Sequence, residues 1–382
     1  MKIFKINQDT NFDEICKFIS PSKEGQAIMK KKANLNFFLL KDIRSPAANI
    51  LKQDALSIGA ELVTHKNTIL NGENSTALLI ATEAQIKELA RKEIAQDFGL
   101  KNLAQFLKSS FKKPVKPQIM GVVNINEDSF NAQSRVDTKS GIKKIEAMIE
   151  EGADYIDLGA VSSRPGSKYV GREVEFERLK DIVAEIYRLN LHEKAKFSLD
   201  SFDEYCLEYA LNQGFKMIND ITADTNLASL AVKYGVQYCL MHMQNSPENM
   251  QNNPHYDDLL GEIDSFFADK IALVRELGCE DIVLDVGIGF GKTPQDNLLL
   301  IKHLEHFLHF DLPLLIGASR KSVINFYSPS EVSKRLSGSL YLHQKAFENG
   351  ASIIRTHDVS EHVQMFKMDE AMRNLSLWSQ NG

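Results

Sequence analysis

Cysteine is scarce in this sequence, and the few that occur are scattered. The 382 residues include four cysteines, none of them in a Cys-x-x-Cys pair. Isolated cysteines exclude the spacing of a zinc ribbon and are typical of proteins that keep their thiols reduced. No apolar run approaches the roughly 18 residues of a membrane span, and the amino terminus lacks the apolar segment of a signal peptide. We therefore expect a cytoplasmic protein with no membrane partner.

An excess of positive charge is absent as well. Lys and Arg number 45 against 51 Asp and Glu, which gives a formal net charge of −6 at pH 7. Nonspecific nucleic-acid binding needs a basic surface, so we expect no nucleic-acid partner. Hydrophobic residues make up 43% of the chain and charged residues 25%, which is ordinary for a soluble globular protein. The length accommodates one large domain and a smaller one.

The pattern of apolar residues in 1–112 predicts a small α/β domain of unknown role. The periodicity of the apolar residues predicts strands at 35–40, 60–64 and 76–81, and helices at 46–60 and 83–95. The polar residues near the strand ends form no catalytic constellation. Residues 113–117, Lys-Pro-Val-Lys-Pro, predict a linker, because two prolines disfavour a regular element.

Residues 118–382 repeat a rhythm of short apolar run, loop and helical stretch. The eight apolar runs are residues 119–123, 155–158, 195–199, 216–218, 237–241, 281–284, 312–316 and 352–354. Eight strands that alternate with helices over this length predict an α/β fold, a (β/α)8 TIM barrel. In such a barrel the catalytic groups lie just after the strands, on one face.

Polar side chains end or follow every one of these runs. They include Asn124, Asp157, Asp200, Asn219, Asp220, His242, Asp285, Ser319, Lys321, Arg355 and His357. A lone Asn or Asp at such a place is as often a helix cap or a hydrogen-bonded buried group as a functional residue. That all eight runs end in polar residues by chance is much less favoured. The acceptors suit a flat heterocycle, and the cations suit phosphate or carboxylate. Asn124 offers an oxygen to Mg²⁺.

Two further patterns resemble binding motifs without matching them. Residues 282–293 are rich in glycine and end in Lys-Thr, but the first glycine of a nucleotide P-loop would have to stand at Val286. The glycines therefore indicate close backbone approach, and we expect Lys292 to be a structural or solvent-facing charge. His303, His306 and His309 recur at helical spacing, but without acidic or Cys partners a helix face is favoured over a metal site.

The motifs resemble those of dihydropteroate synthases. Residues 120–130 resemble the first signature of that family, and residues 152–159 followed by 163–166 resemble the second. The remaining similar segments, in the family's order and spacing, are residues 199–201, 218–220, 240–243, 284–292, 319–322 and 354–357. The resemblance covers residues 118–372.

This resemblance implies condensation of 6-hydroxymethyl-7,8-dihydropterin diphosphate with 4-aminobenzoate, which gives 7,8-dihydropteroate and pyrophosphate in folate biosynthesis. It further implies Mg²⁺ bound at Asn124, a homodimer, and inhibition by sulfonamides. The catalytic residues implied are Lys321, Arg355 and His357. The pterin would be bound by Asp200, Asn219, Met243, Asp285, Phe290 and Lys321, the diphosphate by Asn124, Ser163, Arg355 and His357, and the aminobenzoate by Phe130, Arg164, Pro165 and Ser322.

The first loop departs from the family pattern. Asn126 and Glu127 stand where the family has Thr-Pro, and residues 131–134 lack its two glycines. Because this loop is expected to close over the substrates, a non-catalytic pterin-binding module is one alternative. A pterin-dependent methyltransferase of the same barrel family is another. A third is an aldolase that forms a Schiff base on Lys321.

Overall fold

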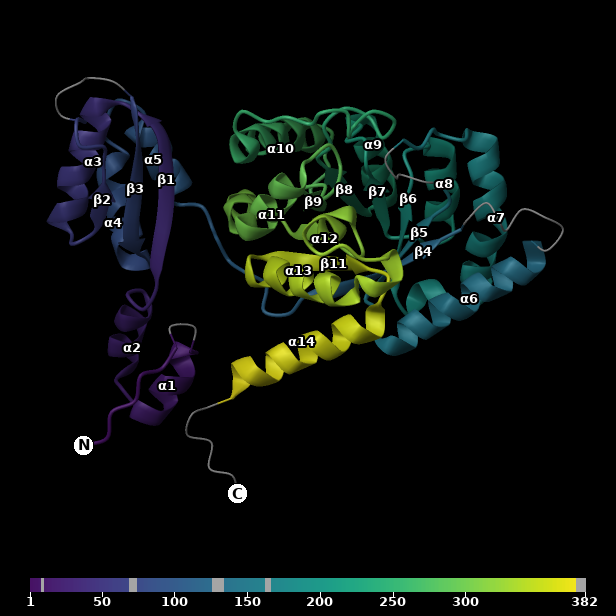
Figure 1. Cartoon of the computed structure of the whole chain (residues 1–382), viewed down its shortest axis with the longest axis horizontal. Helices are drawn as coiled ribbons and strands as arrows, with labels where there is room; N and C mark the ends of the chain where they lie inside the picture. Colours follow the sequence, from purple (N-terminus) through teal and green to yellow (C-terminus); the bar gives the residue numbers. More distant parts are fainter. Residues whose placement is uncertain (8–9, 69–73, 126–133, 162–165, 376–382) are drawn as a thin grey trace. The chain divides into compact units, whose positions relative to one another are not determined.

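The computed structural model describes residues 1–7, 10–68, 74–125, 134–161 and 166–375. The chain divides into two compact units, coloured along the sequence in Figure 1. One comprises residues 1–110 with the chain from Asp369 onward, and the other comprises residues 111–368.

The first unit contains an antiparallel sheet of three strands in the order β1-β3-β2. Phe37 of β1 pairs with Ile80 of β3, and Leu62 of β2 pairs with Leu79. Alternate residues of β3 are buried, as expected for a strand with one face toward a core. The elements are α1 Phe12–Ile19, α2 Lys23–Lys30, β1 Leu35–Ile43, α3 Ser45–Ser57, β2 Glu61–Val63, β3 Ser75–Thr82, α4 Glu83–Glu93 and α5 Leu100–Phe106. The predicted small α/β fold is confirmed, whereas the sequence had not indicated α1, α2 or α5.

The second unit is a closed parallel barrel of eight strands in which each strand pairs with the next along the chain. The circle closes where β11 pairs with β4, and the helices surround the strands (Figure 1). The strands are β4 Gln118–Asn124, β5 Tyr155–Gly159, β6 Lys196–Asp200, β7 Met217–Asp220, β8 Gln237–Met241, β9 Ile282–Asp285, β10 Leu314–Ile316 and β11 Ala351–Thr356. All eight predicted runs are strands, and the predicted barrel is confirmed.

Helices and short 3₁₀ segments follow the strands. The helices are α6 Ser134–Glu151, α7 Arg172–Arg188, α8 Glu204–Asn212, α9 Thr225–Tyr234, α10 Leu259–Glu276, α11 Pro294–Lys302, α12 Ser322–Tyr327, α13 Leu336–Glu348 and α14 Val359–Asn374. The 3₁₀ segments are η2 Leu191–Glu193, η3 Leu304–Phe310 and η4 Val332–Lys334. No helix among the described residues is long and apolar enough to cross a membrane.

The interior of the barrel is a packed core. Seven strands each contribute one fully buried side chain to it, namely Met120, Tyr155, Met217, Cys239, Val283, Leu315 and Ile353. A second, larger apolar layer lies between the strands and the helices. Because the barrel is filled, a ligand can reach only its ends, and the polar side chains lie at the carboxyl ends of the strands.

Candidate active site

The strand register aligns four positions at the rim. Asn124 of β4 is opposite Gly159 of β5, Gly159 is opposite Asp200 of β6, and Asp200 is opposite Asn219 of β7. A Cβ atom at Gly159 would lie 3.4 Å from Asn124 Oδ1 and 3.7 Å from Asp200 Cβ. The glycine therefore leaves room for the Asn124 and Asp200 side chains to lie side by side.

Arg355 connects this row to the last strand. Its Nε donates to Asp157 Oδ2 over 2.6 Å, and its Nη2 donates to Asp200 Oδ2 over 2.8 Å. Burial disfavours a charged arginine, but the two carboxylates raise the pKa of Arg355 above its ordinary value. A guanidinium bound in this way has a fixed plane, which is the requirement for aiming its other N–H groups at an anion.

Asp157 is the fully buried anchor of that ion pair. It also accepts hydrogen bonds from the Ser198 hydroxyl and, over 3.2 Å, from Asn219 Nδ2. Burial and the charge of Asp157 raise the pKa of Asp200 to about 7, although Arg355 opposes the shift. The sequence placed Asp157 at a strand end but assigned it no role. The available signal was a carboxylate inside a run that is otherwise apolar.

Asp285 and Lys321 form a second charged pair of groups on the rim. Burial raises the pKa of Asp285, and its Oδ1 accepts the Gly287 amide over 2.8 Å. Burial lowers the pKa of Lys321 to about 8, against the attraction of Asp285. Lys321 Nζ donates to the backbone oxygen of Ile288 and lies 4.7 Å from the centroid of the Phe290 ring. The loops after β9 and β10 are thus joined through Lys321.

The side chain of Lys292, in the loop after β9, is buried, with 2% of its surface exposed. Its Nζ donates to the backbone oxygens of Phe290 and His242 over 2.9 and 3.2 Å and lies 3.0 Å from His242 Nδ1. Burial lowers the pKa of Lys292 to about 7. Of the two expectations for Lys292, the structural role is confirmed and the solvent-facing position is wrong. Gly287 permits this approach, since a Cβ there would lie 2.0 Å from the His242 oxygen.

Ser319 positions the ring of His357. Its Oγ accepts the His357 backbone N–H over 3.3 Å and lies 2.9 Å from His357 Nδ1. Desolvation by the surrounding protein and the Arg355 cation lower the pKa of His357 to about 4. The ring is therefore neutral near pH 7.

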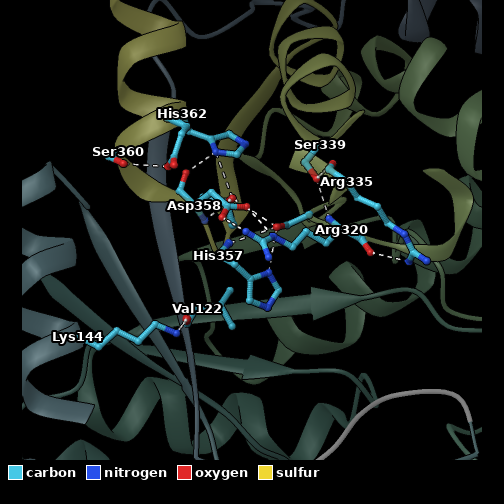
Figure 2. Close-up of polar contacts among 12 residues, drawn as sticks. Val122, Lys144, Arg320, Arg335, Ser339, His357, Asp358, Ser360 and His362 are labelled. Carbon is cyan, nitrogen blue, oxygen red and sulfur yellow. Dashed lines mark hydrogen bonds and ion pairs between the residues drawn. The ribbon is translucent and has the colours of Figure 1, made fainter. Parts of the chain in front are cut away.

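Arg320 links the loop after β10 to the segment after β11, as Figure 2 shows. It forms a bidentate ion pair with Asp358, in which Nε donates over 3.0 Å. Its backbone is held from the other side, because its oxygen accepts from Arg335 Nη1 over 3.1 Å and its N–H donates to Ser339 Oγ over 2.8 Å. These contacts of Arg320 position its neighbours in the chain, Ser319 and Lys321.

Two buried histidines, His343 and His362, also link the loop after β10 to the segment after β11. The Ala318 N–H donates to His343 Nε2 over 2.9 Å, and His343 Nδ1 lies 2.7 Å from His362 Nε2. His362 Nδ1 lies 2.6 Å from the backbone oxygen of Asp358. A neutral ring that accepts at Nε2 donates at Nδ1, so the chain of hydrogen bonds runs from Ala318 to Asp358. These contacts join residues from α13 and α14 that sequence spacing could not relate.

The other predicted site residues occupy different surroundings. Asn124 and Ser322 are exposed, and Met243 and Phe290 are half-buried. Asp220, by contrast, is a structural acceptor for the amides of Thr222 and Asp224. The predicted residues Phe130, Ser163, Arg164 and Pro165 lie outside the described part of the chain.

A cavity of about 150 Å³ opens beside Asp200, between the loops that follow β5, β6, β7 and β8. Its walls include Tyr169 and Phe202, whose ring centroids are 4.8 Å apart, and Ile221. An apolar wall next to a row of acceptors is what a flat, amino-bearing heterocycle requires. Together the barrel, the acceptor row and the adjoining cations define an enzyme site for a flat heterocycle that carries an anionic group.

Comparison with known proteins agrees with this class. Residues 120–357 match the family model described as pterin binding enzyme. The chain is 40% identical over 377 residues to the bifunctional dihydropteroate synthase/dihydropteroate reductase of Helicobacter pylori, which covers 97% of this chain and 99% of that protein. It is 38% identical to the dihydropteroate synthase of Escherichia coli over 67% of this chain and 91% of that one.

Solved structures extend the comparison. The dihydropteroate synthase of Yersinia pestis in a sulfonamide drug complex has a TM-score of 0.63 at 35% identity, covering 68% of this chain and 95% of that one. The enzyme of Clostridium difficile, solved in the presence of pteroic acid, has a TM-score of 0.62 at 32% identity, covering 70% and 100%. The chain belongs to the dihydropteroate synthase family, which are transferases of folate biosynthesis.

Proposed function

We propose that the rim carries out the synthase reaction with the Asp157–Arg355–Asp200 ion pair at its centre. That buried ion pair is the observation that carries the proposal, because it holds a cation for the diphosphate beside an acceptor for the pterin. The substrates are 6-hydroxymethyl-7,8-dihydropterin diphosphate and 4-aminobenzoate.

The pterin edge is bound by Asp200, Asn219 and Asp285, which accept hydrogen bonds from its amino and ring N–H groups. Lys321 donates to the acceptor atoms of the ring. Phe290 and Met243 cover its faces. The attraction between Asp285 and Lys321 supports this division of roles, since one group accepts and the other donates on the same rim.

The diphosphate is bound by Arg355, His357 and Asn124, and the family resemblance adds Ser163. His357 Nδ1 contacts Ser319 Oγ, which leaves Nε2 as the ring nitrogen that faces the diphosphate. The exposed amide oxygen of Asn124 is a hard ligand next to Asp200 and suits Mg²⁺, which takes few protein ligands and retains its waters. When bound, Mg²⁺ neutralises charge on the departing pyrophosphate.

The reaction exchanges one bond for another at the exocyclic carbon of the pterin. The carbon–oxygen bond to the diphosphate breaks, the electron pair leaves with pyrophosphate, and the amine nitrogen of 4-aminobenzoate forms the new bond and then loses a proton. Asp200 and Asp285 stabilise the positive charge that develops on the pterin, and Arg355, His357 and Lys321 stabilise the leaving group. Catalysis is therefore electrostatic and positional.

The family resemblance assigns the aminobenzoate to Phe130, Arg164, Pro165 and Ser322, of which Ser322 is in the described part of the chain. The sulfonamide complex of the Yersinia pestis relative supports competition by sulfonamides for the same place. Formation of labelled dihydropteroate from labelled 4-aminobenzoate tests the function. A sulfonamide should raise the KM for 4-aminobenzoate without changing kcat. Absence of labelled product together with tight pterin binding would instead establish a binding module.

A second activity, reduction of dihydropteroate, is proposed on a separate observation. The similarity to the bifunctional Helicobacter pylori protein extends over 97% of this chain, including most of the first unit. Incubating the full chain with dihydropteroate and a two-electron donor, either NADPH or a reduced flavin, tests it. Tetrahydropteroate formation above the donor-only blank is expected, and its absence with both donors would refute the second activity.

Assembly and location complete the proposal. We propose a cytoplasmic homodimer, with residues 1–112 as a separate domain, a linker at 113–117 and the catalytic domain at 118–382. Light scattering of the purified chain should give twice the monomer mass of 43.0 kDa. A mass equal to that of one chain at micromolar concentration would contradict the dimer.

A further inference from the structure

A cluster of metal-ligating side chains lies outside the rim, on the helical layer of the barrel. Asp264 comes from α10, and His306 and His309 come from η3. The Nε2 atoms of both histidines face the same oxygen, Asp264 Oδ1, at 3.0 and 2.5 Å. One potential ligand atom from each residue lies within 4.8 Å of the others.

The local fold explains why the two histidines face the same way. A 3₁₀ helix has three residues per turn, so side chains three positions apart eclipse each other. Between and after them, Phe307 and Phe310 pack on the buried ring of Phe267, with centroids 5.8 and 6.2 Å away. Phe267 is one turn beyond Asp264 on α10. The aromatic contacts thus hold η3 in the place where its histidines meet the carboxylate.

This arrangement overturns the premise on which the sequence favoured a bare helix face. The expected acidic partner was missing only from the neighbouring sequence, since Asp264 belongs to another helix.

We propose that Asp264, His306 and His309 bind a divalent transition-metal ion, with Zn²⁺ the best match and water as the fourth ligand. Two imidazole nitrogens and one carboxylate oxygen are borderline donors, which suit Zn²⁺, Co²⁺ or Ni²⁺ better than the hard Mg²⁺ or the soft Cu(I). Tetrahedral zinc separates its ligand atoms by roughly 3.3 Å. The contacts of 2.5 and 3.0 Å need to open only slightly to reach that spacing.

The surroundings leave space for the water and indicate a structural role. The side chains of Asp264, His306 and His309 retain 29%, 29% and 14% of their exposure. Segment η3 leads into the amino-terminal end of β10, whereas the rim is formed by the carboxyl ends of the strands. A metal here would join α10 to η3 rather than take part in catalysis.

Co²⁺ tests the site, because its visible spectrum reports both the geometry and the type of ligand in a site suited to Zn²⁺. The full chain is freed of metal with a chelator and titrated with Co²⁺, and Zn²⁺ is then added. We expect one equivalent of Co²⁺ with a tetrahedral spectrum, no thiolate charge-transfer band, and displacement by Zn²⁺. Zn²⁺ should also raise the Tm.

Substitutions locate the site. Asp264→Asn and His309→Gln should each weaken Co²⁺ binding by at least about tenfold, and neither should change the synthase rate in the absence of added transition metal. His303→Gln is the matched control, because His303 precedes η3 but is outside the cluster, and it should bind Co²⁺ as the unmodified chain does. Circular dichroism of the metal-free variants checks folding, and His306→Gln replaces Asp264→Asn if the latter does not fold.

Three results would overturn the proposal. The first is that the unmodified chain takes up no Co²⁺ at concentrations up to about 1 mM. The second is that the folded ligand variants bind Co²⁺ as tightly as the unmodified chain. The third is a thiolate band, which would assign the metal to a cysteine.

Discussion

Asp157→Asn removes the buried charge that anchors Arg355 while preserving the shape of the side chain. Breaking a buried ion pair costs about 3–5 kcal/mol when it leaves a charge unpaired. Here Asp200 still binds Arg355 over 2.8 Å, so we expect the lower end, a loss of about 3 kcal/mol in the free energy of unfolding. Urea unfolding at pH 7 measures it.

The same substitution should change the pH dependence, through Asp200. Asp157 is one of the groups that raise the pKa of Asp200 to about 7. A raised carboxyl pKa means that the folded state holds its proton longer than the unfolded state, so stability falls as the pH rises from about 4 to about 7. In the Asp157→Asn variant this fall should be smaller. If Asp200 acts ionised, the acidic limb of kcat/KM should also move to lower pH.

Ser198→Ala is the matched control, because the Ser198 hydroxyl contacts Asp157 but carries no charge. It should cost only about 1 kcal/mol and leave the acidic limb in place. An Asp157→Asn variant with stability within about 1 kcal/mol of the unmodified chain and an unchanged acidic limb would refute the role of Asp157.

Three other substitutions test the loops of the rim. Lys292→Met removes a buried amine whose pKa is lowered to about 7. Because the folded state loses this proton at a lower pH than the unfolded state does, the unmodified chain gains stability as the pH rises from about 7 to about 10. This gain should disappear from the unfolding curves of the variant, and its persistence would contradict the assignment of Lys292 as a buried amine. His357→Gln keeps a donor near the Nε2 position and should retain about tenfold more kcat than His357→Asn; equal rates would contradict donation from Nε2. Lys321→Met should lower kcat/KM for the pterin diphosphate by about 100-fold or more, while a full rate together with borohydride trapping on the unmodified chain would favour the aldolase alternative.

The fold could be predicted because each of its strands can be identified from a few neighbouring residues in the sequence. Each strand of the barrel is a short apolar run bounded by polar residues, and the number and spacing of the runs indicate the barrel. The rim followed from the same pattern, since parallel strands bring their carboxyl ends together. Asn124, Asp200 and Asn219 are adjacent for this reason alone.

The pairings inside the site could not be predicted, because they join residues that are distant in the sequence. Asp157 and Arg355 are both identifiable as polar groups of the rim, but only the register of β4 between β5 and β11 brings them within hydrogen-bonding distance. The burial of Lys292 likewise depends on the loop after β8. The cluster at Asp264 has the same origin, since its histidines belong to a different helix.

The amino-terminal helices α1 and α2 were missed for a different reason. Each has only eight residues, and a window of that length contains too few turns for a clear helical period. Their caps were the better signal. Asn11 accepts from the amides of Asp13 and Glu14, and Ser22 accepts from the amide of Gly25, as side chains of this type do at helix starts.

The central claim is that this rim transfers the pterin from diphosphate to 4-aminobenzoate, and pyrophosphate release tests it most directly. The full chain should release pyrophosphate only when both substrates are present, in equal amount to the dihydropteroate formed. Asp200→Ala should abolish release by removing pterin binding. Pterin binding without release, release that does not require 4-aminobenzoate, or full activity in the Asp200→Ala variant would contradict the account.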